Sequence, residues 1–420
     1  MRHTHTGSGI TRAQVAGVTL GNALEFYDFL VFAFFAVQIG RTFFPATSPG
    51  AGLLAALATF GAGFLTRPLG AVVLGIMGDR AGRRPAMLVS FAMIGGASLG
   101  VALVPGYHRI GWAAPALVIT LRLLQGFALG GEVGASSAFL AEAAAPERRG
   151  FLVSLQFVGQ NGATLVAGLV GTALASALTE VELAAWGWRV ALGLGVLIVP
   201  VGLRLRRSLP ETLADGAAAT PAPPVSAYRR VAVVGFLTLL ANTICTYVSN
   251  YMTTYAATSL ALPPRTAFGA TVAVGLGGVA GALAGGLLSD RAGRRPLMLW
   301  PQAAACLLVL PGFWLIGAYP GAGSLWGVSF ALRLAVATAA TAAFVHVTEA
   351  LPPRVRSGAL AVLYAVAISV FGGSTQFVVA WLTHATGDPL APAWYMLAAA
   401  VLGLGAMLAA QETAPVKGKA

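Results

Sequence analysis

Twelve long apolar stretches dominate this chain and constrain its fold more than any other feature. A bilayer-spanning helix needs about 20 mostly apolar residues, and each stretch approaches or exceeds that length. Only 10% of the 420 residues are charged, against roughly 25% in a typical soluble domain. This composition excludes a soluble enzyme, a disordered protein and a secreted disulfide scaffold. We therefore expect an all-α, multi-pass membrane protein with spans near 14–40, 52–77, 86–104, 113–141, 151–178, 186–205, 231–258, 267–288, 297–318, 324–347, 358–384 and 393–410.

The basic residues indicate how the chain is oriented. A net charge of +12 could suggest a nucleic-acid binder, but the Lys and Arg residues form short clusters between the apolar stretches. With the N-terminus in the cytoplasm, the cytoplasmic segments hold 19 of them, and the external loops hold 4: Arg41, Arg109, Arg189 and Arg265. By the positive-inside rule, we expect both termini in the cytoplasm, the bilayer as surroundings, and no nucleic-acid partner.

The two halves of the chain repeat each other. Residues 78–85 (GDRAGRRP) recur as residues 289–296 (SDRAGRRP), and Leu-Arg-Leu at 121–123 recurs at 332–334. Six helices repeated in parallel are typical of transporters whose halves rock about a central site. We expect a cytoplasmic N-terminus (1–13), an N-terminal six-helix bundle (14–206), a linker (207–228), a C-terminal six-helix bundle (229–410) and a cytoplasmic tail (411–420).

Several motifs carry a family resemblance that covers nearly the whole chain. The repeated Asp-Arg-Ala-Gly-Arg-Arg resembles the signature loop of the major facilitator superfamily. Three further motifs are similar to the metabolite:proton symporter family: residues 21–29 (GNALEFYDF), 67–71 (RPLGA) and 122–127 (RLLQGF). Others look most like citrate–proton and tricarballylate symporters: residues 42–46 (TFFPA), 60–64 (FGAGF), 105–107 (PGY) and 371–373 (FGG).

The resemblance implies a role for the charged loops. Their side chains are expected to form pairs between the halves that hold an outward-open state and break on rocking. Anchoring of these loops to lipid headgroups is the alternative. The residues concerned are Asp79, Arg80, Arg83, Glu142, Asp290, Arg291, Arg294 and Glu349.

Six charged residues fall deep within the expected spans. Each would cost about 2.5–3.5 kcal/mol on insertion scales if uncompensated, so they must face one another or a water-filled cavity. They are Glu25, Asp28, Arg67, Arg122, Glu132 and Arg333. Because Arg67 falls about 15 Å deep, at the level of Glu25 and Glu132, we expect it to form a structural ion pair with one of them.

Two arginines at equivalent positions of the repeat are candidates for binding an anion. Arg122 shares a helix face with Gln125, and a guanidinium fork suits a carboxylate. Arg333 would face it across the pseudo-symmetry axis, so the pair predicts a clamp for a multiply charged anion. Pairing with Asp28, Glu132 or helix carbonyls is the alternative. We expect side-chain amides to complete the substrate site: Gln156, Gln160 with the adjacent Asn161, Asn250 and Gln376. The alternative is that these polar groups join membrane helices to one another.

Buried acids are natural proton carriers, since burial favours the neutral form. Glu25 and Asp28 share one helix face, and Glu132 and His346 are further candidates. We therefore expect a proton-coupled symporter importing a small organic anion, citrate or a related di- or tricarboxylate, in a bacterial inner membrane. It would act by alternating access, as a monomer, with the proton as coupling ion and no cofactor, metal or catalysis. The same fold could instead carry a monocarboxylate, a keto acid or a zwitterion such as proline or betaine; a drug exporter fits the motifs less well.

Overall fold

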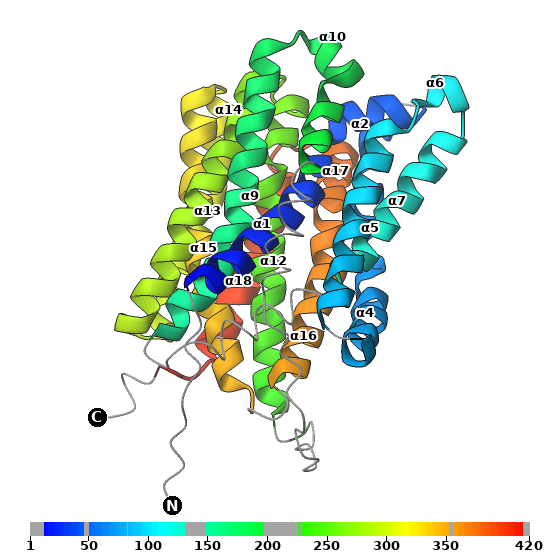
Figure 1. Ribbon diagram of the computed structural model, residues 1–420. Coiled ribbons are helices and arrows are strands. Elements are labelled where there is room, and N and C mark those ends of the chain that lie inside the picture. The colour runs from blue at the N-terminus through cyan, green and yellow to red at the C-terminus, as the bar shows by residue number, and fades with distance from the viewer. Residues whose placement is uncertain are drawn as a thin grey trace, which may run out of the picture.

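The computed structural model describes residues 12–45, 50–81, 83–130, 148–196, 226, 228–352 and 356–414. Every regular element among them is helical (Figure 1). The N-terminal half contributes α1 (Arg12–Phe34), α2 (Ala36–Phe43), α3 (Ala51–Leu65), α4 (Arg67–Ala81), α5 (Arg83–Leu103), α6 (Tyr107–Ile110), α7 (Ala113–Leu129), α9 (Arg149–Ala177), α10 (Glu180–Glu182) and η2 (Leu183–Gly187). The C-terminal half contributes α12 (Arg229–Thr258), α13 (Pro264–Ala292), α14 (Arg294–Ala318), α15 (Ala322–Ala350), α16 (Arg356–Val366), η4 (Ala367–Gly372), α17 (Gly373–Thr386) and α18 (Ala391–Leu408).

Helices among the described residues overlap each of the twelve expected spans. Within the described ranges, nine helices are long and apolar enough to cross a membrane, and the segments 88–103 and 113–129 are apolar but shorter. Residues 188–196 are helical as well. Residues 197–205 of that expected span, and residues 131–141 of the expected span 113–141, lie outside the described residues. The predicted linker also lies outside them, apart from 226 and 228.

Two expected spans are interrupted. The first breaks at Phe35, whose backbone leaves the helical region (φ −99°, ψ 21°) while its ring packs 4.6 Å from that of Phe268. The second breaks at Thr66, just before Pro68. A proline lacks the N–H for a helical hydrogen bond and crowds the preceding turn. The Thr66 hydroxyl donates to the carbonyl of Leu123 at 2.6 Å, which ties this break to α7.

The eleventh span is not a uniform α-helix. Between α16 and α17 it widens into η4, a π-helical segment, and such segments are frequent at functional sites. Gly372 ends η4 directly against Tyr247, where a Cβ would come within 2.9 Å of the tyrosine ring. The missing side chain lets α12 approach the wide turn closely.

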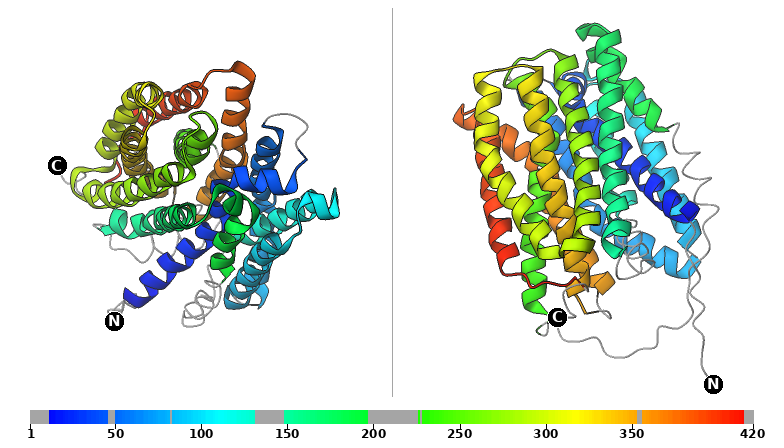
Figure 2. Two further views of the ribbon diagram at one scale, coloured as in Figure 1. Left: turned by 90° about the horizontal axis from the view of Figure 1, so that it is seen from above. Right: turned by 90° about the vertical axis from the view of Figure 1, so that its left-hand side faces the viewer.

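The two halves meet along α9 and α13, which lie side by side in both figures (Figures 1 and 2). Glycines make this approach possible. A Cβ at Gly150 would crowd Asp290 and Gly286, one at Gly275 would crowd Leu165, and one at Gly168 would crowd Thr271. Small residues at membrane helix interfaces permit such close packing. On the other side, α3 meets α17, and α1 crosses the bundle obliquely.

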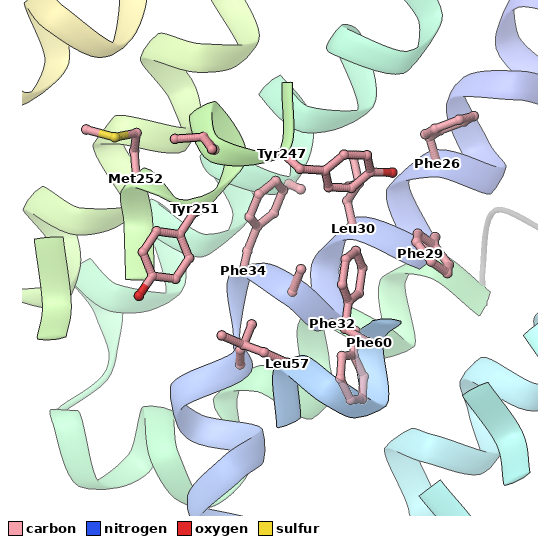
Figure 3. Close-up of a cluster of buried hydrophobic side chains, with 14 of the residues drawn as sticks. Phe26, Phe29, Leu30, Phe32, Phe34, Leu57, Phe60, Tyr247, Tyr251 and Met252 are labelled. Atoms are coloured by element: carbon pink, nitrogen blue, oxygen red, sulfur yellow. The ribbon is translucent and has the colours of Figure 1, made fainter. Parts of the chain in front are cut away.

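An aromatic layer lies where α1, α3 and α12 pack together (Figure 3). Phe29 of α1 lies 5.0 Å from Phe60 and 4.8 Å from Phe64 of α3, measured between ring centroids. Tyr247 of α12 lies 5.7 Å from Phe64 and 6.2 Å from Phe60. This layer packs against the guanidinium groups of Arg67 and Arg122.

Candidate functional site

A cavity lies at the centre of the molecule and is lined by both halves. Helices α1 and α9 contribute from the N-terminal half, and α12, α15, α16 and η4 contribute from the C-terminal half. Its polar lining consists of Gln160, Asn161, Thr164, Asn242, Thr243, Thr246, Tyr247, Asn250, Arg333 and Tyr364. The remaining lining is aromatic or aliphatic, so the polar groups converge within an apolar wall, as is typical of small-molecule sites.

Arg333 is the one charged residue among the described residues that line this cavity. It is 6% exposed, and its three hydrogen bonds to described residues all go to neutral groups. Its Nε and Nη2 donate to Asn161 Oδ1 at 3.1 and 2.7 Å, and its Nη1 donates to Thr246 Oγ1 at 2.7 Å. Among the side chains that the structure describes, no carboxylate lies within ion-pair distance of Arg333. A buried cation without a counter-charge is costly, so this position favours an anion.

Other polar atoms around the cavity are also left without partners. Within the described residues, both polar atoms of the Asn242 amide, Oδ1 of Asn250 and Nε2 of Gln160 are buried and make no hydrogen bond. Buried polar groups normally have partners. These amides are therefore free to bind a polar ligand or water beside Arg333, and two of them, Gln160 and Asn250, were predicted from the sequence.

The second buried charge network lies within the N-terminal half. Asp28 of α1 is 4% exposed, and its Oδ2 accepts hydrogen bonds from the Ser98 hydroxyl and from Gln125 Nε2, the latter at 3.1 Å. Gln125 Oε1 in turn accepts from Arg122 Nη1 at 2.8 Å. Gln125 therefore links the carboxylate to the guanidinium, which do not touch directly.

Aromatic rings surround Arg67 and Arg122, two buried arginines of the N-terminal half at membrane depth. The Arg122 guanidinium lies 4.3, 4.4 and 5.3 Å from the ring centroids of Phe29, Phe32 and Phe60. Arg67 lies 4.6 Å from Phe29 and 4.2 Å from the ring of Phe64. A desolvated cation–π contact contributes about 2 kcal/mol, so the rings offset part of the cost of burying both charges.

The two predicted clamp arginines occupy different surroundings. Arg333 lines the cavity, whereas Arg122 is 0% exposed and is not among the lining residues. Phe60 of the aromatic layer packs against both the Arg122 guanidinium and the ring of Tyr247, and Tyr247 lines the cavity. Binding of one anion by both arginines stays a prediction.

Three further predicted residues are buried outside the cavity lining. Gln156 and Gln376 are 2% and 1% exposed, and the amide of Gln376 has no hydrogen-bond partner among the described residues. His346 is 6% exposed and lies near the end of α15, where its Nδ1 is 3.2 Å from the Thr413 hydroxyl. The structure thus places His346 beside the charged loops and away from Asp28.

A charge cluster joins the halves at the end of the bundle where α9 begins and α13 ends. Arg294 is fully buried, and its Nη1 donates to Asp290 Oδ1 at 2.6 Å. Its Nε and Nη2 reach the two oxygens of Glu349 at 3.2 and 3.1 Å, a bidentate pair. Arg149 of the N-terminal half lies 3.9 Å from the same carboxylate.

Asp290 also caps a helix of the opposite half. Its Oδ1 accepts from the Gly150 N–H and its Oδ2 from the Phe151 N–H, both at 2.9 Å. These N–H groups belong to the first turn of α9. N–H groups in a first turn have no acceptor within the helix, and they form the positive end of the helix dipole. The carboxylate therefore stabilises contact between the halves through charge and hydrogen bonding together.

The segment after α18 completes this cluster. Glu412 accepts from the backbone N–H groups of Arg294 and Arg295 at 2.9 and 3.1 Å, and the Thr413 hydroxyl donates to Glu349 at 3.0 Å. Burial raises the pKa of Glu412, but backbone N–H donors, including those of Ala414 and Arg294, outweigh it and hold the pKa below its usual value. The carboxylate is therefore ionised near neutral pH.

Several predicted residues are not described. Glu132 and Glu142 lie outside the described residues, as do the side chains of Glu25, Asp79, Arg80 and Arg83. Arg291 is exposed at the end of α13. The predicted ion pair of Arg67 would involve Glu25 or Glu132 and stays a prediction. Across the described ranges, no group of three or more His, Cys, Asp or Glu residues could hold a metal ion.

Sequence reasoning missed three residues that the structure brings to these sites. Ser98 and Thr246 are single polar residues in apolar helices, and Glu412 follows the last apolar stretch and belongs to no motif. Asn161 was indicated only by its position beside Gln160. A single sequence carries no sign of which helix each of these side chains contacts.

The sequence profile of the Major Facilitator Superfamily matches residues 18–374. The chain belongs to this family, and the nine candidate spans found among its described residues make it a multi-pass membrane protein.

Individual members of known transporter families are similar to this chain in sequence and in structure. The chain is 37% identical over 403 residues to the citrate-proton symporter of Salmonella typhi, covering 94% of this chain and 93% of that one. It is 33% identical to the proline/betaine transporter of Escherichia coli K12, over 98% of this chain and 86% of the other. The crystal structure of a D-xylose-proton symporter matches with a TM-score of 0.76 at 19% identity, over 97% of this chain and 99% of the other. The expected fold and resemblance are thereby confirmed.

Proposed function

We propose that this protein is a proton-coupled symporter that imports a small organic anion, citrate or a related di- or tricarboxylate. The observation that carries the proposal is Arg333: a buried cation in the central cavity whose described partners are all neutral. A guanidinium in this position favours a carboxylate, and the neighbouring unpartnered amides can bind further carboxylate or hydroxyl oxygens. The similarity to two citrate-proton symporters at 35–37% identity supports this substrate class.

Proton coupling is assigned to the Asp28 network. Asp28 is buried, and Gln125 connects it to Arg122. Protonation of Asp28 neutralises the carboxylate that accepts hydrogen bonds from Gln125 and Ser98. Gln125 then loses a charged acceptor, and Arg122 is no longer linked through Gln125 to an anion. A shift of the Arg122 guanidinium would move Phe60, which packs against it, and Phe60 would in turn move Tyr247 at the cavity wall.

The cluster of Asp290, Arg294 and Glu349 is proposed as the cytoplasmic gate. It joins the two halves through the first turn of α9 and through Arg149. Basic residues concentrate at this end, which supports placing both termini in the cytoplasm of a bacterial cell. Rocking of the halves must break these contacts. We expect the transporter to work as a monomer, without a cofactor or a catalytic step.

The test is uptake of radiolabelled citrate by the purified protein in proteoliposomes. With an inwardly directed proton gradient, we expect citrate to accumulate several-fold above its external concentration. Collapse of the gradient with a protonophore should abolish that accumulation. Uptake that ignores the gradient would contradict coupling, and no flux of any tricarboxylate or dicarboxylate would contradict the substrate class.

A zwitterion such as betaine is a second candidate, favoured by the ring-rich cavity wall. Phe26, Phe157, Tyr247, Phe344 and Tyr364 surround the space beside Arg333, and aromatic faces bind quaternary ammonium groups. A carboxylate on Arg333 and an ammonium group against the rings would occupy the same cavity. Competition decides between the candidates: excess betaine should leave citrate uptake unchanged if the cavity selects di- or tricarboxylates.

A further inference from the structure

Asn161 bridges the two halves at the centre of the cavity. It lies on α9 in the N-terminal half, is 2% exposed, and its Oδ1 accepts both Nε–H and Nη2–H of Arg333 on α15. Its own Nδ2 is turned back to the Phe157 carbonyl at 2.7 Å. The amide therefore presents only its oxygen to the guanidinium.

This geometry resembles the approach of a carboxylate oxygen. Two adjacent N–H donors of a guanidinium are the pair that a carboxylate engages in a fork. Asn161 supplies one neutral oxygen to both donors, so it satisfies their hydrogen bonding while leaving the charge of Arg333 unbalanced. A substrate carboxylate would bind the same donors more strongly because it is charged.

The contact depends on a glycine of a third helix. The Asn161 side chain lies directly against Gly278 of α13, where an added Cβ would overlap the carboxamide. Gly278 thus leaves the space through which Asn161 reaches Arg333. By contrast, a Cβ at Gly162, one residue along α9, would meet nothing within 4 Å.

We propose that Asn161 is a placeholder for a substrate carboxylate and a latch between the halves. In the empty protein it holds Arg333 and ties α9 to α15; an arriving carboxylate displaces its oxygen and thereby releases one contact that opposes rocking. Asn161 is a positioning residue that acts through Arg333. The placeholder role rests on the proposed function, whereas the latch between the halves does not.

Opposite substitutions separate a placeholder from a merely structural residue. Asn161→Ala removes the competitor, so the citrate dissociation constant of the purified protein should fall about three- to tenfold in calorimetry. Asn161→Asp supplies a built-in carboxylate, so the same constant should rise at least tenfold. Ser176→Ala, an exposed position on the same helix, should change nothing. If both Asn161 variants weaken binding equally, or neither changes it, the placeholder is refuted.

The latch has a readout that needs no substrate. Spin labels at Val181 and Tyr319, both exposed and in opposite halves, report the distance between the halves in a background lacking Cys245 and Cys306. Without ligand, Asn161→Ala should broaden the distance distribution relative to the parent protein. An unchanged distribution would overturn the latch. If the parent protein binds no carboxylate, the proposed function fails, and this distance still decides whether the latch exists.

A glycine pair gives an independent check. Gly278→Ala should displace the Asn161 side chain and reproduce the broadened distances of Asn161→Ala. Gly162→Ala, the same change beside open space, should leave the distances as in the parent protein. Broadening by both variants, or by neither, would contradict the role of Asn161.

Discussion

Arg122 and Arg333 occupy equivalent positions in the two halves, and the structure surrounds them in opposite ways. Arg122 is enclosed by three aromatic rings and linked through Gln125 to the carboxylate of Asp28. Arg333 borders the cavity, and its described partners are the neutral Asn161 and Thr246. The carboxylate of Asp28 lies two hydrogen bonds away from Arg122, whereas no carboxylate among the described side chains lies within ion-pair distance of Arg333.

The difference teaches how a duplicated framework can divide two tasks. The sequence repeat places an arginine at the equivalent position of each half, but the neighbouring helices decide whether its counter-charge belongs to the protein or to a ligand. We assign proton handling to the Arg122 half and anion binding to the Arg333 half. The predictions below test that division, beginning with the largest effect.

Removal of Arg333 should produce the largest loss. Truncating one partner of a buried charge pair costs roughly 2–5 kcal/mol, so Arg333→Ala should lower citrate kcat/KM by about 100-fold or more in proteoliposomes. Arg265→Ala removes an exposed arginine at the start of α13 and should leave uptake within twofold. Near-normal uptake by Arg333→Ala would break the comparison.

Neutralising Asp28 should separate exchange from accumulation. Asn keeps an oxygen for the Ser98 hydroxyl but cannot take up a proton. Asp28→Asn should therefore abolish gradient-driven accumulation, while citrate counterflow stays within about threefold of the unmodified protein. Accumulation that still follows the proton gradient in this variant would move the coupling role to another acid.

A substitution in the proposed cytoplasmic gate should have a smaller effect than the loss of Arg333 or Asp28. Asp290 caps α9 of the other half, and loss of a cap costs about 1–2 kcal/mol, or roughly 5- to 30-fold in a two-state population. Asp290→Ala should thus shift the distance between spin labels at Val181 and Tyr319 toward the value of the state that is open at the proposed cytoplasmic gate. Asp388 bonds the Leu390 N–H within its own half, so Asp388→Ala is the matched control. Equal shifts by both variants would remove Asp290 from the gate.

Glu412 should have the smallest effect, and its pH dependence has a defined sign. Its pKa is lowered in the folded protein, so its stabilisation is present above the ordinary Glu pKa of about 4.3 and disappears as pH falls through the lowered value. Glu412→Gln should reduce stability by less than about 1 kcal/mol, because solvent screens this partly exposed group. The difference in Tm from the unmodified protein should be constant from pH 8 to 5 and shrink below that; a difference that grows on acidification would contradict the assignment.

The sequence predicted the framework well because membrane spans and orientation depend on local composition. A segment inside lipid must satisfy its own backbone hydrogen bonds, which a helix does, so each long apolar stretch predicts a helical span. The breaks at Phe35 and Thr66 and the π-segment before Gly373 were not predicted, since they depend on packing against α13, α7 and α12. Pro68 was a visible signal for one of them.

The site was predictable only in part. Charge at membrane depth identified Asp28, Arg122 and Arg333, because cost alone marks such residues as exceptional. Their partners were not predictable: Ser98 and Thr246 become significant only through contacts between helices. Likewise, the repeat suggested a symmetric clamp, whereas the aromatic residues around Arg122 set the two arginines apart.

Calorimetric binding of citrate to purified Arg333→Gln and Arg122→Gln, at one pH and with folding verified, tests the division of labour most directly. If the anion binds in the Arg333 half, Arg333→Gln should raise the dissociation constant by about 100-fold, and Arg122→Gln should raise it less than fivefold. Equal losses in the two variants, or the larger loss in Arg122→Gln, would contradict the account.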